Sequence, residues 1–175
     1  MKRVFQIISY FKNLARTVRN VIIITVLLIV VLKVGDVFID LDDIINWGCD
    51  TELCCEDCDT ITVTRVIDGD TLVSTMGRVR LYGVDTPEVG QRCASEATDR
   101  LRELAGDTVR VEPGPRSKDP YGRHLFYLYT DDAESIDEGL VNEGLAVAWL
   151  KDGQHMQYLS DVEMQAREND VGCLW

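Results

Sequence analysis

Short runs in which apolar and polar residues alternate recur along the middle of the chain, and each is typical of a β-strand with one buried face. They predict five strands, at about residues 61–67, 70–76, 78–84, 108–112 and 124–129. Apolar residues at helical spacing predict three helices, from an N-cap at Ser95 to Gly106, from a capping box of Ser135 and Glu138 to Gly144, and from about His155 to Asn169. The pattern indicates an α+β domain over residues 61–175.

A continuous apolar run lies near the start of the chain, at residues 21–32, and continues weakly to Ile39. Its twelve residues are fewer than the ~20 that span a bilayer, so the run fits a signal-peptide core or a membrane anchor. No small-residue cleavage motif follows, which favours a transmembrane anchor over residues 21–39. A buried globular helix is the alternative.

Residues 1–20 hold five basic residues, no acidic residue and an amphipathic run. Because basic flanking segments stay on the cytoplasmic side, we expect this segment at the inner membrane surface and the later domain outside the cell. The lipid bilayer would then be a partner of residues 21–39. If the apolar segment is cleaved, the domain would be secreted.

Residues 40–60 carry eight acidic residues and no Lys or Arg, and this composition predicts a linker between membrane and domain. Four of the six cysteines fall in it: Cys49, Cys54, Cys55 and Cys58. Disulfides are favoured over a structural zinc site because the segment is expected outside the cell, and the pairing stays open. We expect the other two cysteines, Cys93 and Cys173, to form a bridge that ties the C-terminal tail to the first helix.

Three acidic residues and one arginine fall at strand ends or in the loop that follows them. Asp70 begins the second predicted strand, Arg80 lies within the third, and Asp85 and Glu88 leave that strand on either side of Pro87. Each feature alone also has a purely structural interpretation, such as a hairpin turn at Asp70 or a solvated loop at Glu88. The spacing nevertheless predicts that they gather at one site.

This combination of residues has a specific chemical use. Two carboxylates with a carbonyl or hydroxyl suit a hard cation such as Ca²⁺, and a third carboxylate held off the metal can take a proton from water. An arginine in the same site can bind a phosphate through two parallel hydrogen bonds. The set therefore indicates metal-assisted attack on a phosphodiester.

Three motifs carry a resemblance to a known family: DGDT at 68–71, RLYGVDTPE at 80–88 and DPYGR at 119–123. In this order and at about this spacing, they resemble the staphylococcal (micrococcal) nuclease family, or thermonucleases, from about Thr62 onward. The resemblance implies a five-stranded OB-fold barrel with three helices. It also implies cleavage of DNA or RNA at the 5′ P–O bond with little sequence preference, leaving 3′-phosphate ends.

The resemblance assigns roles position by position. Asp70 and Asp85 match the calcium carboxylates, and Thr86 matches the residue that adds a backbone carbonyl to the metal. Glu88 matches the general base. Arg80 and Arg123 match the two phosphate-binding arginines, although Arg123 could also simply pair with Asp119.

The segment from Pro113 to Arg123 is the densest basic part of the domain and is expected to be a loop. Basic residues interleaved with an aromatic suit contact with a phosphate backbone and a stacked base of a single or locally opened strand. The candidate substrate-binding residues are Arg116, Lys118, Tyr121 and Trp149. A solvated loop is the alternative for Arg116 and Lys118, and Trp149 could instead belong to the core.

The net charge is unusual for a protein that binds polyanions. The whole chain carries −12, and from Ile61 onward 12 basic and 21 acidic residues give −9. Only two of those twelve basic residues are lysines, which fits a high-salt habitat where repulsion from DNA is screened. The sequence thus predicts a Ca²⁺-dependent endonuclease at the cell surface. The alternative is a non-catalytic OB-fold module that binds nucleic acid or protein there.

Overall fold

The structure is a computed structural model that describes Ile23 and residues 52–175. Residues Asn46–Trp175 form one compact unit, and the described part of the other unit is a single residue. The predicted amphipathic segment, most of the predicted anchor and Cys49 lie outside the described residues. Within the described residues, no helix has both the length and the apolar character needed to cross a membrane.

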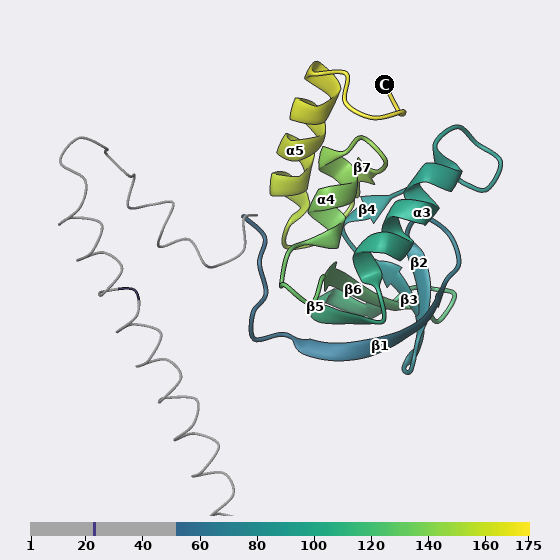
Figure 1. The fold of residues 1–175 in the computed structure, drawn as a ribbon, viewed down its shortest axis with the longest axis vertical. Coiled ribbons are helices and arrows are strands. Elements are labelled where there is room, and N and C mark those ends of the chain that lie inside the picture. Colours follow the sequence, from purple (N-terminus) through teal and green to yellow (C-terminus); the bar gives the residue numbers. More distant parts are fainter. Residues whose placement is uncertain (1–22, 24–51) are drawn as a thin grey trace, which may run out of the picture. The chain divides into compact units, whose positions relative to one another are not determined.

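Five strands close into a barrel, as predicted, and three helices pack around it (Figure 1). The strands are β1 (Asp59–Val66), β2 (Thr71–Ser74), β3 (Gly77–Leu81), β5 (Thr108–Lys118) and β6 (His124–Tyr129), and they close in the order β1-β2-β3-β6-β5. The β3–β6 pair is parallel and the other neighbours are antiparallel. This is the expected α+β class with an OB-like barrel.

Two very short strands, β4 (Val84–Asp85) and β7 (Val147–Ala148), form a separate antiparallel pair that was not predicted. A two-residue strand carries no alternation that a sequence pattern could show. The pair extends through a hydrogen bond of 2.8 Å from the Trp149 N–H to the Gly83 carbonyl. It thereby places Asp85 and Trp149 near each other in space.

The three helices are α3 (Ala94–Ala105), α4 (Ile136–Asn142) and α5 (Met156–Glu168). The predicted cap of α4 is confirmed, because the Ser135 side chain accepts from the Glu138 N–H at 3.1 Å. The predicted cap of α3 is wrong: the N-cap is Cys93, and Ser95 lies inside the helix with its hydroxyl on Glu96. Cys93 is joined to Cys173 in a disulfide, so the start of α3 is tied to the C-terminal tail.

Strand β5 is longer than predicted and includes residues 113–118, which we expected to be a loop. Beyond Val111 it has β6 on one side only, because its pairing with β1 ends there. A proline lacks the N–H that an inner strand must donate, but an edge position tolerates it. Pro113 therefore stays in the strand opposite Phe126, and the ladder becomes irregular between Pro113 and Lys118.

The core has two parts. The barrel interior and the inner faces of α3 and α4 form the larger one, built mainly of Leu, Ile and Val. The smaller one lies on the outer face of β6 and contains Tyr82, Leu125, Tyr127, Tyr129 and Leu159. Burial of each such side chain contributes roughly 1.5–3 kcal/mol to the free energy of unfolding. The two cores therefore stabilise the strands that carry the polar site.

The described part of the predicted linker packs on this domain. Leu53 joins the smaller core, the Cys55 N–H donates to the Ala133 carbonyl at 3.2 Å, and Arg110 donates to the Glu56 carbonyl at 2.6 Å. Cys55 and Cys58 form a disulfide, and Cys54 is also disulfide-bonded. Among the described residues no cysteine is free, so these three thiols are not zinc ligands.

Candidate active site

A tight turn between β1 and β2 presents Asp70. The Asp68 carboxylate accepts from the Asp70 N–H at 3.2 Å, and Asp70 itself lies directly before β2. Gly69 is needed here, because a Cβ would stand 2.7 Å from the Thr86 hydroxyl and 2.8 Å from the Ala97 methyl. The close approach lets Thr86 donate to Asp70 Oδ2 from its N–H (3.0 Å) and its hydroxyl (2.9 Å).

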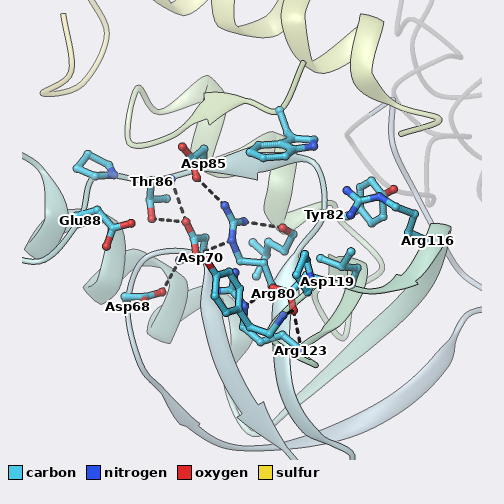
Figure 2. Close-up of a pocket in the computed structure, with 16 residues that line it drawn as sticks. Asp68, Asp70, Arg80, Tyr82, Asp85, Thr86, Glu88, Arg116, Asp119 and Arg123 are labelled. Carbon is cyan, nitrogen blue, oxygen red and sulfur yellow. Dashed lines mark hydrogen bonds and ion pairs between the residues drawn. The ribbon is translucent and has the colours of Figure 1, made fainter. Parts of the chain in front are cut away.

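Arg80 lies at the centre of the site (Figure 2) and is buried, with 8% exposure. Its Nε is 3.0 Å from Asp70 Oδ1 and its Nη2 is 2.7 Å from Asp85 Oδ1. Its Nη1 donates to the carbonyls of Leu81 and Val84, both at 2.6 Å. One guanidinium thus brings together the two carboxylates that the sequence predicted as metal ligands.

Glu88 lies in the loop after β4 and faces the same pocket. Its N–H donates to Gln91 Oε1 at 2.9 Å, which shapes the loop. Within residues 52–175, no hydrogen bond or ion pair joins the Glu88 carboxylate to another side chain or to the backbone, and the side chain is exposed. A carboxylate without a partner in the domain is available to a proton donor in the pocket.

The DPYGR turn presents Arg123. Asp119 Oδ1 accepts from the N–H groups of Tyr121 and Arg123, both at 2.9 Å, and its Oδ2 accepts from Arg123 Nε at 2.6 Å. Burial opposes ionisation of Asp119, but the hydrogen bonds from Arg123 outweigh it and lower the pKa of this carboxyl. Arg123 therefore does pair with Asp119, and its Nη1 still donates to the Thr71 hydroxyl at 3.2 Å.

These side chains line one cavity of about 310 Å³. All six residues assigned by the motifs lie in its wall: Asp70, Arg80, Asp85, Thr86, Glu88 and Arg123. Asp68 lies there too, and burial together with the neighbouring Asp70 charge raises the pKa of its carboxyl. Figure 2 shows Arg80 in the middle, with Asp70 and Asp85 on one side of it and Asp119 with Arg123 on the other.

The predicted substrate-binding residues separate into two groups. Arg116, Tyr121 and Trp149 line the cavity, and Tyr121 is 85% exposed at its edge. Lys118 is not part of the cavity wall, so the cavity does not bring it together with the other three candidates. Lys118 lies opposite His124 in the β5–β6 ladder, so the two side chains share a face of the sheet. The residues on either side of His124, Arg123 and Leu125, line the cavity, so Lys118 lies on the other face.

Asp152 is a residue of this region that the sequence interpretation missed. It accepts from Arg116 Nε (2.5 Å), Trp149 Nε1 (2.9 Å) and the Tyr82 hydroxyl (3.1 Å). The hydrogen bonds from Arg116 are the main reason that its pKa falls to about 2. Asp152 therefore holds the cavity residues Arg116 and Trp149 in place. It lies in a Lys-Asp-Gly loop, and no sequence motif identifies an aspartate there as part of a site.

The fold and site together define a class: a small OB-like barrel whose outer face carries an acid–arginine pocket suited to a phosphate group. The chain belongs to the staphylococcal nuclease homologue family, whose family model matches residues 78–175. The resemblance inferred from the motifs is thus confirmed.

Individual relatives agree with this assignment. The chain is 34% identical to a thermonuclease of Staphylococcus hyicus over 122 residues, which cover 62% of this chain and 72% of that protein. It is 40% identical to a thermonuclease of Staphylococcus intermedius over 99 residues, covering 49% and 57%. It is 34% identical to a micrococcal nuclease of Shigella flexneri over 128 residues, covering 65% and 71%.

Proposed function

We propose that the chain is a Ca²⁺-dependent endonuclease that hydrolyses phosphodiester bonds of DNA or RNA with little sequence preference. Cleavage of the 5′ P–O bond would leave 3′-phosphate ends. The main support is that all six motif residues line one cavity in a chain of the staphylococcal nuclease homologue family. An acid–arginine pocket alone would fit many anion-binding proteins, whereas the family narrows the reaction to a nuclease hydrolase.

The donor set of the pocket fits a hard cation. Asp70 and Asp85 are held together by a shared guanidinium, and the Asp85 side chain is 53% exposed toward the cavity. Among the described residues, no group of three or more His, Cys, Asp or Glu side chains is arranged to hold a metal. Two carboxylates would therefore need a backbone carbonyl and water molecules to complete the shell of a bound cation. Calcium accepts such mixed oxygen shells, with Asp70, Asp85 and the Thr86 carbonyl as the protein ligands. When bound, it would supply positive charge beside the phosphate.

The protein residues divide the remaining work. Glu88 takes a proton from the attacking water, since its carboxylate is exposed to the cavity. Arg80 and Arg123 donate N–H groups to the non-bridging phosphate oxygens, on which negative charge increases in the transition state. Asp119 and Thr71 orient Arg123, and Asp152 orients Arg116 and Trp149 beside the substrate.

We also propose that the domain acts outside the cell, anchored by residues 21–39 or released after cleavage. Support comes from the disulfides Cys55–Cys58 and Cys93–Cys173, since such bonds persist in oxidising compartments. The substrate would then be extracellular DNA or RNA.

Cleavage of a labelled single-stranded DNA by the full chain, with Ca²⁺ or with EGTA and at low and multimolar salt, tests the function. We expect cleavage only with Ca²⁺. Glu88→Gln should lower kcat by at least about 100-fold, because general-base catalysis contributes about 10²–10⁴. Glu168→Gln, an equal charge change at an exposed residue of α5, serves as the control and should cleave like the parent.

Two outcomes would contradict the proposal. Cleavage that survives EGTA would remove the calcium requirement. DNA binding without cleavage under every condition would instead support the alternative, a non-catalytic OB-fold module that uses the same pocket for binding.

A further inference from the structure

The basic side chains of the domain differ in whether they are neutralised. Of the twelve from Ile61 onward, nine contact an acidic side chain, a backbone carbonyl or an aromatic ring. Within the described part of the chain, three have no such partner: Arg65, Arg78 and Lys118. In a domain with a net charge of −9, unpaired arginines are an exception that needs a reason.

Arg65 and Arg78 lie in one cross-strand row. Arg65 is opposite Val73 in the β1–β2 ladder, and Val73 is opposite Arg78 in the β2–β3 ladder. Residues opposite each other share a face of the sheet. The neighbouring row contains Leu72 and Val79, which are buried, and Val66, which is half-buried and packs against the core, so the row with the two arginines is on the outer face.

A β-bulge is responsible for the direction of Arg65. The register shifts between Val63 and Arg65, and the hydroxyl of the intervening Thr64 donates to the Val73 carbonyl at 2.8 Å. Simple alternation from the inward-facing Val63 would direct Arg65 into the barrel. The extra residue reverses this, as bulges commonly do when they re-aim a side chain.

This outer row adjoins the candidate active site. Arg80 is two residues after Arg78 on β3, so both lie on the same face. The parallel β3–β6 ladder begins with Val79 opposite His124, and the same register continued by one residue before this pair would bring Arg123 beside Arg78. Three interstrand spacings therefore separate Arg123 from Arg65, about 14 Å in all. This distance corresponds to about four nucleotides at a rise of 3.4 Å.

We propose that Arg65 and Arg78 form a phosphate-binding track that extends the substrate site across the outer faces of β3, β2 and β1. Both side chains are exposed and unpaired in the described domain, and they lie on either side of Val73 in one outward-facing row, so a strand that crosses this row can contact both. The ligand is the sugar–phosphate backbone of a polynucleotide strand whose scissile phosphate lies between Arg80 and Arg123. The track rests on the proposed function and adds a preference for long strands over short ones.

Binding of fluorescent oligothymidylates of 2 and 20 nucleotides to the full chain tests the track, with Glu88→Gln as the parent to prevent cleavage, because the single phosphate of the dinucleotide occupies the site between Arg80 and Arg123 and does not reach the track. The test variant adds Arg65→Gln and Arg78→Gln. The control variant adds Arg102→Gln and Arg167→Gln, which remove the same charge from the exposed faces of α3 and α5. A salt slope of about −0.7 per phosphate predicts about 25-fold weaker binding of the 20-mer at 0.1 M salt for two lost contacts.

The expected result has three parts: the 20-mer binds about 25-fold more weakly to the test variant, its salt slope decreases by about 1.4, and binding of the dinucleotide changes by less than about twofold. The control variant should bind both lengths like the parent. Equal losses for both lengths, or a 20-mer loss no larger than in the control, would overturn the track.

The same measurements separate this inference from the proposed function. If the chain without Glu88→Gln does not cleave, but 20-mer binding still depends on the two arginines, the nuclease proposal fails and the track stands. If it cleaves with Ca²⁺ and the test variant binds the 20-mer like the parent, only the track fails. Absence of binding to both lengths overturns both.

Discussion

The buried carboxylate of Asp137 should make the domain more stable in mild acid. Asp137 lies in α4 with no exposed surface, and its two oxygens accept from the N–H groups of Gly83 (2.8 Å) and Leu128 (2.9 Å). Burial raises its pKa from 3.8 to about 6, because loss of solvent outweighs the two backbone donors. The ionised form is therefore the costly one in the folded protein.

The size and sign of the effect follow from this shift. Raising the pKa from 3.8 to about 6 corresponds to about 3 kcal/mol of folding free energy. Below about pH 6 the folded protein holds a proton on Asp137, whereas the unfolded chain holds it only below about pH 4, so stability increases as the pH falls through this range. Between pH 7 and pH 5 the free energy of unfolding should increase by about 1.3 kcal/mol.

Three carboxylates with lowered pKa values act at lower pH than Asp137, whereas Asp68, whose pKa is raised by burial, acts in the same direction as Asp137 and cancels in a comparison of parent and Asp137 variant. The pKa values of Glu112, Asp119 and Asp152 are lowered, so the stability they add is present at neutral pH and is lost as the pH falls below about 4.5. The window from pH 5 to 7 therefore isolates Asp137 from these three groups.

Urea unfolding of the full chain, followed by tryptophan fluorescence at pH 5, 6 and 7, measures the effect against Asp137→Asn. The amide does not ionise, so the variant should lose the pH dependence of this group. At pH 7 the free energy of unfolding of the variant should stay near that of the parent. Removing the buried charge stabilises the folded protein, and this offsets the cost of about 1–3 kcal/mol for one backbone N–H that the amide leaves without an acceptor. A parent-minus-variant difference that is flat, or that decreases toward pH 5, would show that the backbone donors outweigh burial and refute the reasoning.

Two stability predictions use the same urea assay. The Cys93–Cys173 bond joins residues 80 positions apart, so Cys93→Ser with Cys173→Ser should lower the free energy of unfolding by about 4.5 kcal/mol through loop entropy. The corresponding double change at Cys55 and Cys58, which are three positions apart, should lower it by about 1.6 kcal/mol. Equal losses for the two pairs would contradict this prediction. Gly83→Ala should cost about 1–3 kcal/mol, because its Cβ would overlap Leu159 and stand 3.0 Å from Asp137 Oδ1. Gly139→Ala, whose nearest neighbour is at 3.7 Å, is the control and should be neutral or stabilising.

The part of the fold that local signals specify could be predicted from the sequence. The Ser135 capping box, the Gly106 helix end and the barrel strands all depend on residues within a few positions of each other. The structure also brings the six motif residues into one cavity: the strand pattern indicated that Asp70, Arg80, Asp85 and Glu88 gather, and the family resemblance added Thr86 and Arg123.

Features that depend on distant residues could not be predicted. Asp152 contacts Arg116 across 36 positions, and Asp137 contacts Gly83 across 54. The outward direction of Arg65 depends on a bulge at Thr64, and one extra residue in a strand reverses every later side chain. The strand at residues 113–118, where a loop was expected, has a related cause, since the continuation of β5 past Pro113 depends on its becoming an edge strand.

The contacts of Arg80 explain why an arginine is required at the centre of the site. Its Nη1 is fixed on two backbone carbonyls, while Nε and Nη2 face the two carboxylates. A lysine ammonium could not keep both sets of contacts, because it is a single point charge on a flexible stem. In the proposed function, the carbonyls hold the guanidinium plane while the edge that faces the acids exchanges them for phosphate oxygens. This arrangement would let the pocket bind an anion inside an acidic domain without rearranging the strand that carries it.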